Sequence, residues 1–433
     1  MSKSTNEQIL EVITRQYLDS HDFNGLPIQK LIGICEVNRK IIQDAVINLV
    51  DQELVGAIFS DAEINIHIIR TGFEPKEIQI GKLTAGNLTA GNLNACLYPL
   101  PKHLESVVKK ELYVEKPYEL ALALGEPQLS FRSFDLSVLE YYRNDPRYRY
   151  ENDDIRGTIT IKDEYYKTES VLERDQVLLN SFGFSYDKDL NRAVAVFIRY
   201  LANLSPEHQQ IWHARELEGD YELHQDYYRN TILGEWGRGI SVFDAFIIEI
   251  GLINKMCVVM VRPKLFKTDY GEYGENKRRE FGFLIRPTLT EFNNFIHLLD
   301  KMLSEDINKK FFMKDIQPQR EITRGDGKIT VQNKGTLSML DEWIRTYYKT
   351  ADWEYWDKTI ESLKKIRKMR QKPAHSLNKN EFDQKFIKEQ REIIMRAYEG
   401  VRTLRLMLQN HRLVQAADIE IPEWLDKGTI WTQ

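Results

Sequence analysis

The sequence predicts a chain of several domains, predominantly α-helical with a mixed α/β central part. Its 433 residues exceed what one ordinary hydrophobic core covers. Apolar residues recur at helical spacing towards both ends of the chain, whereas Arg156–Lys162 alternates as a strand does. We therefore expect three domains, at residues 1–73, 74–288 and 289–433.

The composition favours a cytoplasmic protein. With 60 basic and 65 acidic residues the net charge is −5, so any nucleic-acid contact must use a local basic patch. Cys35, Cys96 and Cys257 are far apart, which suits a reducing compartment and predicts neither disulfides nor a zinc site. The N-terminus lacks the apolar core of a signal peptide. Charged residues interrupt the apolar stretch Phe243–Val261, which predicts a buried helix and strand and no membrane contact.

Residues 5–72 carry the pattern of three helices followed by two strands. Apolar residues recur at helical spacing in three segments, Ile9–Tyr17, Ile28–Ile32 and Ile41–Leu49. Asn38 precedes the third segment and is a typical N-cap. The runs Leu54–Phe59 and Ile64–Ile69, separated by residues 60–63, are expected to pair as a hairpin.

Three helices and a hairpin in this order resemble a winged helix-turn-helix domain, whose third helix enters a DNA groove. The residues that this helix would expose to DNA are Asn38, Arg39, Lys40 and Gln43. Asp44, Asp51 and Glu53 weaken its positive charge, and winged helices also serve as protein–protein modules. DNA binding and protein binding both remain open for this part.

The central part mixes several signals. Ala193–Leu204 predicts an apolar helix, and Ser205 with Pro206 predicts the start of the next one. Tyrosines and tryptophans alternate with arginines here. They could stack on bases, but an aromatic core with arginines at its edge is favoured. The duplicated Leu-Thr-Ala-Gly-Asn at residues 83–92 indicates stacked turns or a linker, because a solenoid needs longer repeats.

His208, His213 and His224 lie close together in sequence, but their spacing matches no metal-binding motif. We therefore expect neither a metal nor a cofactor.

From Thr288 onward helical patterns dominate. Helices are expected at residues 292–303, 337–348, 354–370 and 381–410, with a loop or hairpin over 317–335. Ile360, Leu363, Ile366 and Met369 would face a core, which leaves the basic residues of the same segment on the opposite side. Pro373 should end this helix, so that Arg370 and His375 lie at the mouth of a helical hairpin.

This arrangement resembles the HEPN family, small helical domains with an Arg-x4-6-His motif at such a junction. Here the motif reads Arg370-Gln-Lys-Pro-Ala-His375, and the resemblance covers residues 289–415, most specifically 360–411. The residue after the arginine is often Asn, Asp or His in the family, and Gln371 departs from this.

The resemblance implies a metal-independent endoribonuclease of a bacterial toxin or anti-phage defence system, acting as a homodimer. Arg370 and His375 would be catalytic. The RNA-binding candidates around them are Lys364, Arg367, Lys368, Gln371 and Lys372. Histidine can move the proton of a ribose 2′-hydroxyl, and an arginine fork can stabilise the charged phosphate of the transition state.

The same arginine–histidine motif also occurs as Arg15-x5-His21 and as Arg405-x5-His411. In the latter, Arg405 is expected to be solvated. Only the motif at Arg370 combines a basic helix, a proline stop and a long returning helix. An alternative is that Arg370 pairs with a carboxylate in a non-catalytic scaffold. The chain would then be a winged-helix regulator or adaptor that dimerises through its C-terminal region. No motif typical of an NTPase, dehydrogenase, esterase or zincin occurs.

Overall fold

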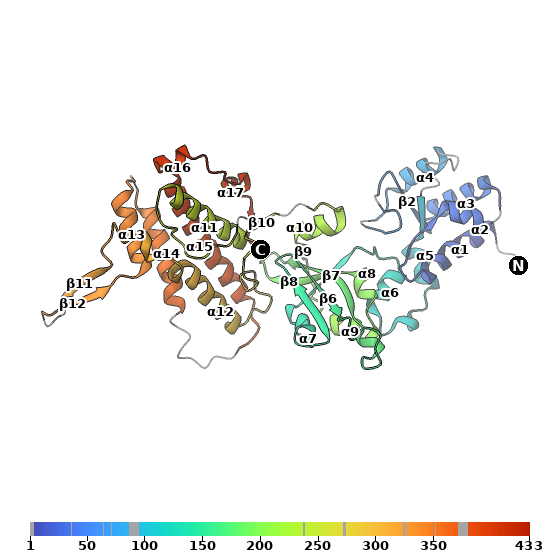
Figure 1. Cartoon of the computed structure of the whole chain (residues 1–433). Helices are drawn as coiled ribbons and strands as arrows, with labels where there is room; N and C mark the ends of the chain where they lie inside the picture. The colour runs from blue at the N-terminus through green and yellow to red at the C-terminus, as the bar shows by residue number, and fades with distance from the viewer. Residues whose placement is uncertain are drawn as a thin grey trace. The chain divides into compact units, whose positions relative to one another are not determined.

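The chain forms two compact units of mixed helix and sheet in a computed structural model (Figure 1). The first unit comprises residues 1–187 and 193–236, and the second comprises 188–192 and 237–433. The predicted boundaries at 73/74 and 288/289 fall inside these units. The structure describes residues 4–35, 37–63, 65–70, 72–85, 95–236, 239–271, 274–323, 325, 327–350, 352–370 and 380–433.

The first unit begins with the three expected helices. They are α1 (Thr5–Asp19), α2 (Ile28–Cys35) and α3 (Arg39–Asp51). A capping box between Ser4 and Glu7 starts α1, and Asn38 caps α3 as predicted. Their apolar faces meet in one buried cluster that includes Ile13, Leu31 and Val46.

A small sheet covers these helices, with the strand order β1-β3-β2. Its strands are β1 (Leu26–Pro27), β2 (Val55–Phe59) and β3 (Ala95–Pro99). The predicted hairpin partner of β2 is wrong, because residues 65–69 contain a turn and a bend at 66–68 and no strand, and β2 pairs with β3. An Asn65 side chain that accepts from the His67 amide favours a turn there.

The helix α4 (Lys76–Ala85) lies in sequence between β2 and β3 and packs against α3. It contains the first residues of the duplicated pentapeptide, and residues 86–92 of the duplication lie outside the described residues.

A second sheet follows in the order β4-β8-β7-β6-β5, with β9 paired to β7. Its strands are β4 (Phe131–Phe134), β5 (Tyr148–Asn152), β6 (Arg156–Ile161), β7 (Leu178–Tyr186), β8 (Arg192–Phe197) and β9 (Glu222–Leu223). The strand predicted at Arg156 is confirmed. The helix predicted from Ala193 is wrong in its first half, where β8 is buried on both faces and therefore reads as a continuous apolar run.

Short helices complete this unit. They are α5 (Pro101–Val107), α6 (Pro117–Ala123), α7 (Glu140–Arg143), α8 (Ile198–Ala202), α9 (Pro206–His213) and α10 (Gln225–Tyr228). Ser205 caps α9, as its sequence predicts. Part of the aromatic set forms a core, whereas Tyr141 and Trp236 are exposed. In this core the buried Tyr142 hydroxyl accepts from Trp212 Nε1 at 2.9 Å and lies 2.8 Å from His208 Nδ1.

The second unit is a bundle of long helices with an exposed hairpin (Figure 1). The helices are α11 (Val242–Val259), α12 (Leu289–Asp300), α13 (Thr336–Tyr347), α14 (Glu354–Arg370), α15 (Lys385–Gln409), α16 (Arg412–Ala416) and α17 (Glu423–Lys427). The strands are β10 (Ile240–Ser241), β11 (Gln319–Thr323), β12 (Ile329–Asn333) and β13 (Ile430–Trp431).

The long apolar stretch near residue 250 forms one continuous helix, α11, so the strand expected at its end is wrong. Ser241 caps α11, and the helix is buried on most of its surface, which accounts for its apolar residues on all sides. The predicted helices after Thr288 and the hairpin of β11 and β12 are confirmed. Among the described residues, no helix is both long and apolar enough to cross a membrane.

Candidate functional site

The helix α14 divides its residues between a core face and a basic face. Ile360, Leu363 and Ile366 are buried, which confirms the predicted spacing. On the other side Arg367 and Lys368 are exposed. Lys364 is half-buried, and its Nζ lies 3.5 Å from Asp341 Oδ2. The basic face of α14 (Lys364, Lys365, Arg367 and Lys368) is therefore a local cationic surface on an acidic chain.

Arg370, the last residue of α14, is held by two carboxylates. Its Nη1 donates to Asp300 Oδ2 at 2.8 Å and also to Glu305. The side chain of Asp300 is only 2% exposed and also accepts from Ser304 Oγ, so this carboxylate is firmly placed. Both bonds leave through Nη1, and among the described residues Nε and Nη2 of Arg370 have no hydrogen-bond partner. The Arg370 side chain is 33% exposed, so solvent and a ligand can reach part of it.

These contacts set the charges at the end of α14. The hydrogen bond from Arg370 lowers the pKa of Glu305, and the bond to Asp300 raises the pKa of Arg370. The cluster therefore holds one guanidinium between two carboxylates. His375, Gln371 and Lys372 lie outside the described residues, so the contacts of the predicted pair are described for Arg370 alone.

The acidic partners of Arg370 were missed by reasoning from the sequence. Glu305 ends the π-helical segment Lys301–Glu305 that extends α12. One signal was available: Asp300 follows Phe292 and Ile296 at helical spacing and so takes a core position, where a carboxylate needs a partner.

The second arginine–histidine motif of the bundle consists of Arg405 on α15 and His411 just after it, and its arginine is closed off from solvent. Arg405 was expected to be solvated, but it is fully buried and donates through Nε and Nη2 to the equally buried Glu249. Burial raises the pKa of Glu249 even though Arg405 favours its charged form. His411 caps α16, with Nδ1 accepting from the Leu413 amide. This arginine has no access to a phosphate.

The predicted DNA-binding residues of α3 are largely engaged within the protein. Asn38 accepts from the Lys40 amide at 2.8 Å, and Lys40 Nζ pairs with Asp44 at 2.9 Å. Gln43 was expected to be exposed, but it is 3% exposed and donates to the Leu83 carbonyl of α4. Arg39 alone of the four is exposed and without such a contact among the described residues.

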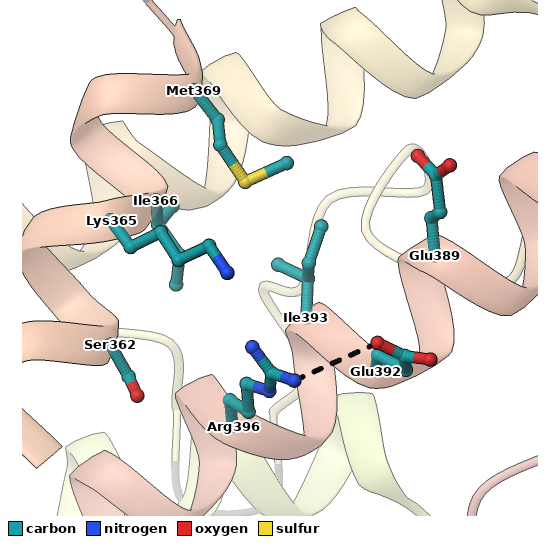
Figure 2. Close-up of a pocket in the computed structure, with 8 residues that line it drawn as sticks. All are labelled: Ser362, Lys365, Ile366, Met369, Glu389, Glu392, Ile393 and Arg396. Carbon is teal, nitrogen blue, oxygen red and sulfur yellow. Dashed lines mark ion pairs between the residues drawn. The ribbon is translucent and has the colours of Figure 1, made fainter. Parts of the chain in front are cut away.

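A cavity of about 140 Å³ opens between α14 and α15 (Figure 2). Each helix contributes residues at positions i, i+3, i+4 and i+7, which lie on one helical face. They are Ser362, Lys365, Ile366 and Met369 from α14, and Glu389, Glu392, Ile393 and Arg396 from α15. The dashed line in Figure 2 marks the Glu392–Arg396 ion pair, 3.7 Å long.

The three clustered histidines serve separate local roles. His208 is buried against Tyr142, His213 Nδ1 lies 3.2 Å from Glu216, and His224 caps α10. In the described part of the chain, no group of three or more histidine, cysteine, aspartate or glutamate side chains is placed to hold a metal ion.

Comparisons of the chain with protein-family models, with curated proteins and with solved structures found no match.

Proposed function

We propose that the second unit binds RNA along the basic face of α14 and cuts it without a metal ion, as a HEPN-type endoribonuclease. The observation that carries this proposal is the placement of Arg370. Its guanidinium is bonded through one nitrogen, its side chain is one-third exposed, and it ends a helix on which Lys365, Arg367 and Lys368 are also exposed.

The chemistry follows from the two residue types of the motif. The Nε and Nη2 edge of Arg370 can donate two parallel hydrogen bonds to a phosphate and stabilise its extra charge during the attack of the 2′-hydroxyl. Asp300 and Glu305 would orient the guanidinium, and His375, five residues further on, would move the proton. The flanking Arg367 and Lys368, together with Lys364, Gln371 and Lys372, would contact neighbouring phosphates.

The test is RNA cleavage by the purified protein and by Arg370→Lys, Arg370→Ala and His375→Ala variants. Arg370→Lys keeps a cation for Asp300 but removes the planar fork, so it separates catalysis from folding. All three variants should lose at least about a hundredfold in rate, the scale for a general acid–base residue or a charge-stabilising donor.

Matched controls are Lys358→Ala, a cation at the far end of α14 paired with Glu354, and His411→Ala from the competing motif. Both should cut like the unaltered protein. Arg370 and His375 variants that fold normally and cut at the unaltered rate would refute the proposal.

The resemblance further supports a cytoplasmic homodimer in which two Arg370–His375 pairs meet, acting as a toxin or in anti-phage defence. Its signature would be growth arrest with RNA damage on expression in bacteria. Both effects should disappear with His375→Ala.

A second candidate function is a winged-helix adaptor or regulator. Three helices closed by a sheet of order β1-β3-β2 support the winged-helix assignment. The surface near the turn between α2 and α3 favours a protein partner over DNA, because Ile34, Val37 and Ile41 are 44%, 39% and 48% exposed while Lys40 is already paired. The ion pairs of Arg370 with Asp300 and Glu305 are also the arrangement expected of a non-catalytic scaffold. In this role the second unit would serve for dimerisation, and RNA would remain uncut in every variant.

A further inference from the structure

The cavity between α14 and α15 has an apolar floor. Ile366 and Ile393 are 3% and 9% exposed, so the cavity ends on packed side chains from both helices. Figure 2 shows Met369 and Lys365 reaching from α14 towards α15, with Ile393 between the two helices. At about 140 Å³ the cavity is below the roughly 300 Å³ at which pockets for drug-sized ligands begin. It therefore suits a single planar ring system.

The rim of the cavity is charged and asymmetric. Glu392 is paired with Arg396, whereas the Glu389 carboxylate forms no hydrogen bond and no ion pair within 4 Å among the described residues. Glu389 is exposed, so water solvates its carboxylate in the free protein. A carboxylate only accepts hydrogen bonds, so a ligand that displaces this water must offer N–H or O–H donors. Lys365 on the opposite rim is exposed and can contact an anion.

A nucleotide within an RNA strand combines these features: a flat apolar ring, donors at the ring edge and a phosphate beside it. The cavity lies near the proposed cutting site along α14, because Met369 precedes Arg370, but the two side chains leave the helix about 100° apart and Arg370 turns towards Asp300 of α12. Lys365 and Arg370 are separated by about 7.5 Å along the helix axis at 1.5 Å per residue. Bases of single-stranded RNA are commonly bound in this way, with side chains reading their Watson–Crick edges.

We propose that this cavity receives a guanine base of the bound RNA, with Glu389 accepting from its N1–H and its N2 amino group. Guanine is the base with two neighbouring donors on that edge, which match the two oxygens of one carboxylate. Adenine and cytosine place a ring acceptor beside their amino group, and uracil flanks its one N–H with carbonyls, so each would meet Glu389 with a repulsive contact. This inference rests on the proposed RNA-cutting function and names its sequence preference.

Binding provides the first test. The full-length protein is titrated with fluorescent pentanucleotides UUGUU, UUIUU and UUAUU, 2′-O-methylated throughout so that they resist cleavage. Inosine lacks the N2 amino group, and loss of this bond to a charged acceptor should weaken binding about tenfold. Adenine should bind more weakly still. Glu389→Gln should remove the discrimination, whereas Glu399→Gln, which changes the same charge on α15 outside the cavity, should retain it.

Equal binding of the three oligonucleotides, binding of none, or unchanged discrimination by Glu389→Gln would overturn the guanine pocket. Cleavage of a randomised RNA pool separates this failure from that of the proposed function. Cutting that depends on Arg370 and His375 but shows no enrichment of guanine near the cut refutes the pocket alone. Guanine-selective binding without any cleavage would uphold the pocket and refute the nuclease.

Discussion

The ends of α14 and α15 carry the same kind of motif but present opposite environments. At the end of α14, Arg370 is one-third exposed and bonded to Asp300 and Glu305 through one nitrogen. On α15, Arg405 is fully buried and uses two nitrogens for Glu249. The arrangement at Arg370 leaves guanidinium N–H donors for a ligand. The arrangement at Arg405 uses the guanidinium to join α15 to α11. An arginine–histidine spacing therefore acquires meaning only from burial and from the carboxylates around it.

The largest expected effect concerns the closed pair. Arg405→Ala would leave Glu249 as an uncompensated buried charge and should lower the free energy of unfolding by about 3–5 kcal/mol. Arg370→Ala should cost less, about 1–2 kcal/mol, because Glu305 is half exposed and the buried Asp300 keeps the hydrogen bond from Ser304. Urea denaturation of both variants at pH 7 measures the difference.

A double variant, Arg405→Met with Glu249→Leu, is the control for this pair. It should recover most of the lost stability, since apolar residues often replace a buried ion pair without cost. Equal costs for the two single arginine variants would remove the distinction between the two helix ends.

The second effect concerns RNA affinity. Reversing two exposed cations of α14, with Arg367→Glu and Lys368→Glu, should weaken binding of single-stranded RNA roughly a hundredfold at low salt. The slope of the logarithm of the binding constant against the logarithm of the salt concentration should become shallower by about 1.4, because two phosphate contacts are lost. The matched reversal of Lys388 on α15 and Arg412 on α16, both exposed, should change affinity less than threefold. Similar losses in both pairs would indicate that overall charge, and not the basic face of α14, binds RNA.

A smaller effect is expected at the end of α15. His411→Ala removes the side chain that accepts from the Leu413 amide and should lower the free energy of unfolding by less than about 1 kcal/mol. RNA cleavage should stay at the unaltered rate. A strong loss of cleavage with normal folding would move the active site from Arg370 to the α15 motif.

The smallest effect is a pH dependence at the end of α14. Because Arg370 lowers the pKa of Glu305 in the folded protein, this contact stabilises the fold above the ordinary glutamate pKa of about 4.3. Its contribution is lost as the pH falls through the lower folded value. The stability difference between the unaltered protein and Glu305→Gln should therefore be constant from pH 7 to pH 5 and shrink below pH 4.

Local patterns in the sequence predicted most helices of the second unit. The apolar residues of α14 recur with the period of one buried face, and its predicted bounds coincide with the observed helix. A continuous apolar run is less informative, because a doubly buried strand and a buried helix share it. For this reason the sequence predicts a helix where β8 lies and a strand at the end of α11.

The surroundings of the candidate residues depended on tertiary contacts that no local pattern contains. Spacing identified Arg370, but its partners come from Asp300 and Glu305, more than sixty positions earlier. Likewise Gln43 borders the apolar face of α3, and the packing of α4 against this edge turns a residue expected to be exposed into a buried one.

The long connection between two neighbouring strands of the first sheet affects how this part of the chain folds. The strands β2 and β3 are direct neighbours, yet residues 60–94 separate them, where a hairpin through residues 60–63 was expected. If the intervening segment were flexible, the longer loop would add about 2 kcal/mol of closure entropy, at about 0.6 kcal/mol for each doubling of its length. The helix α4 packs against α3, so if this contact forms first it shortens the loop that must close before β3 can pair. The strand β3 lies between β1 and β2 and pairs with both. Its pairing should therefore be the late and slow event in the folding of this sheet.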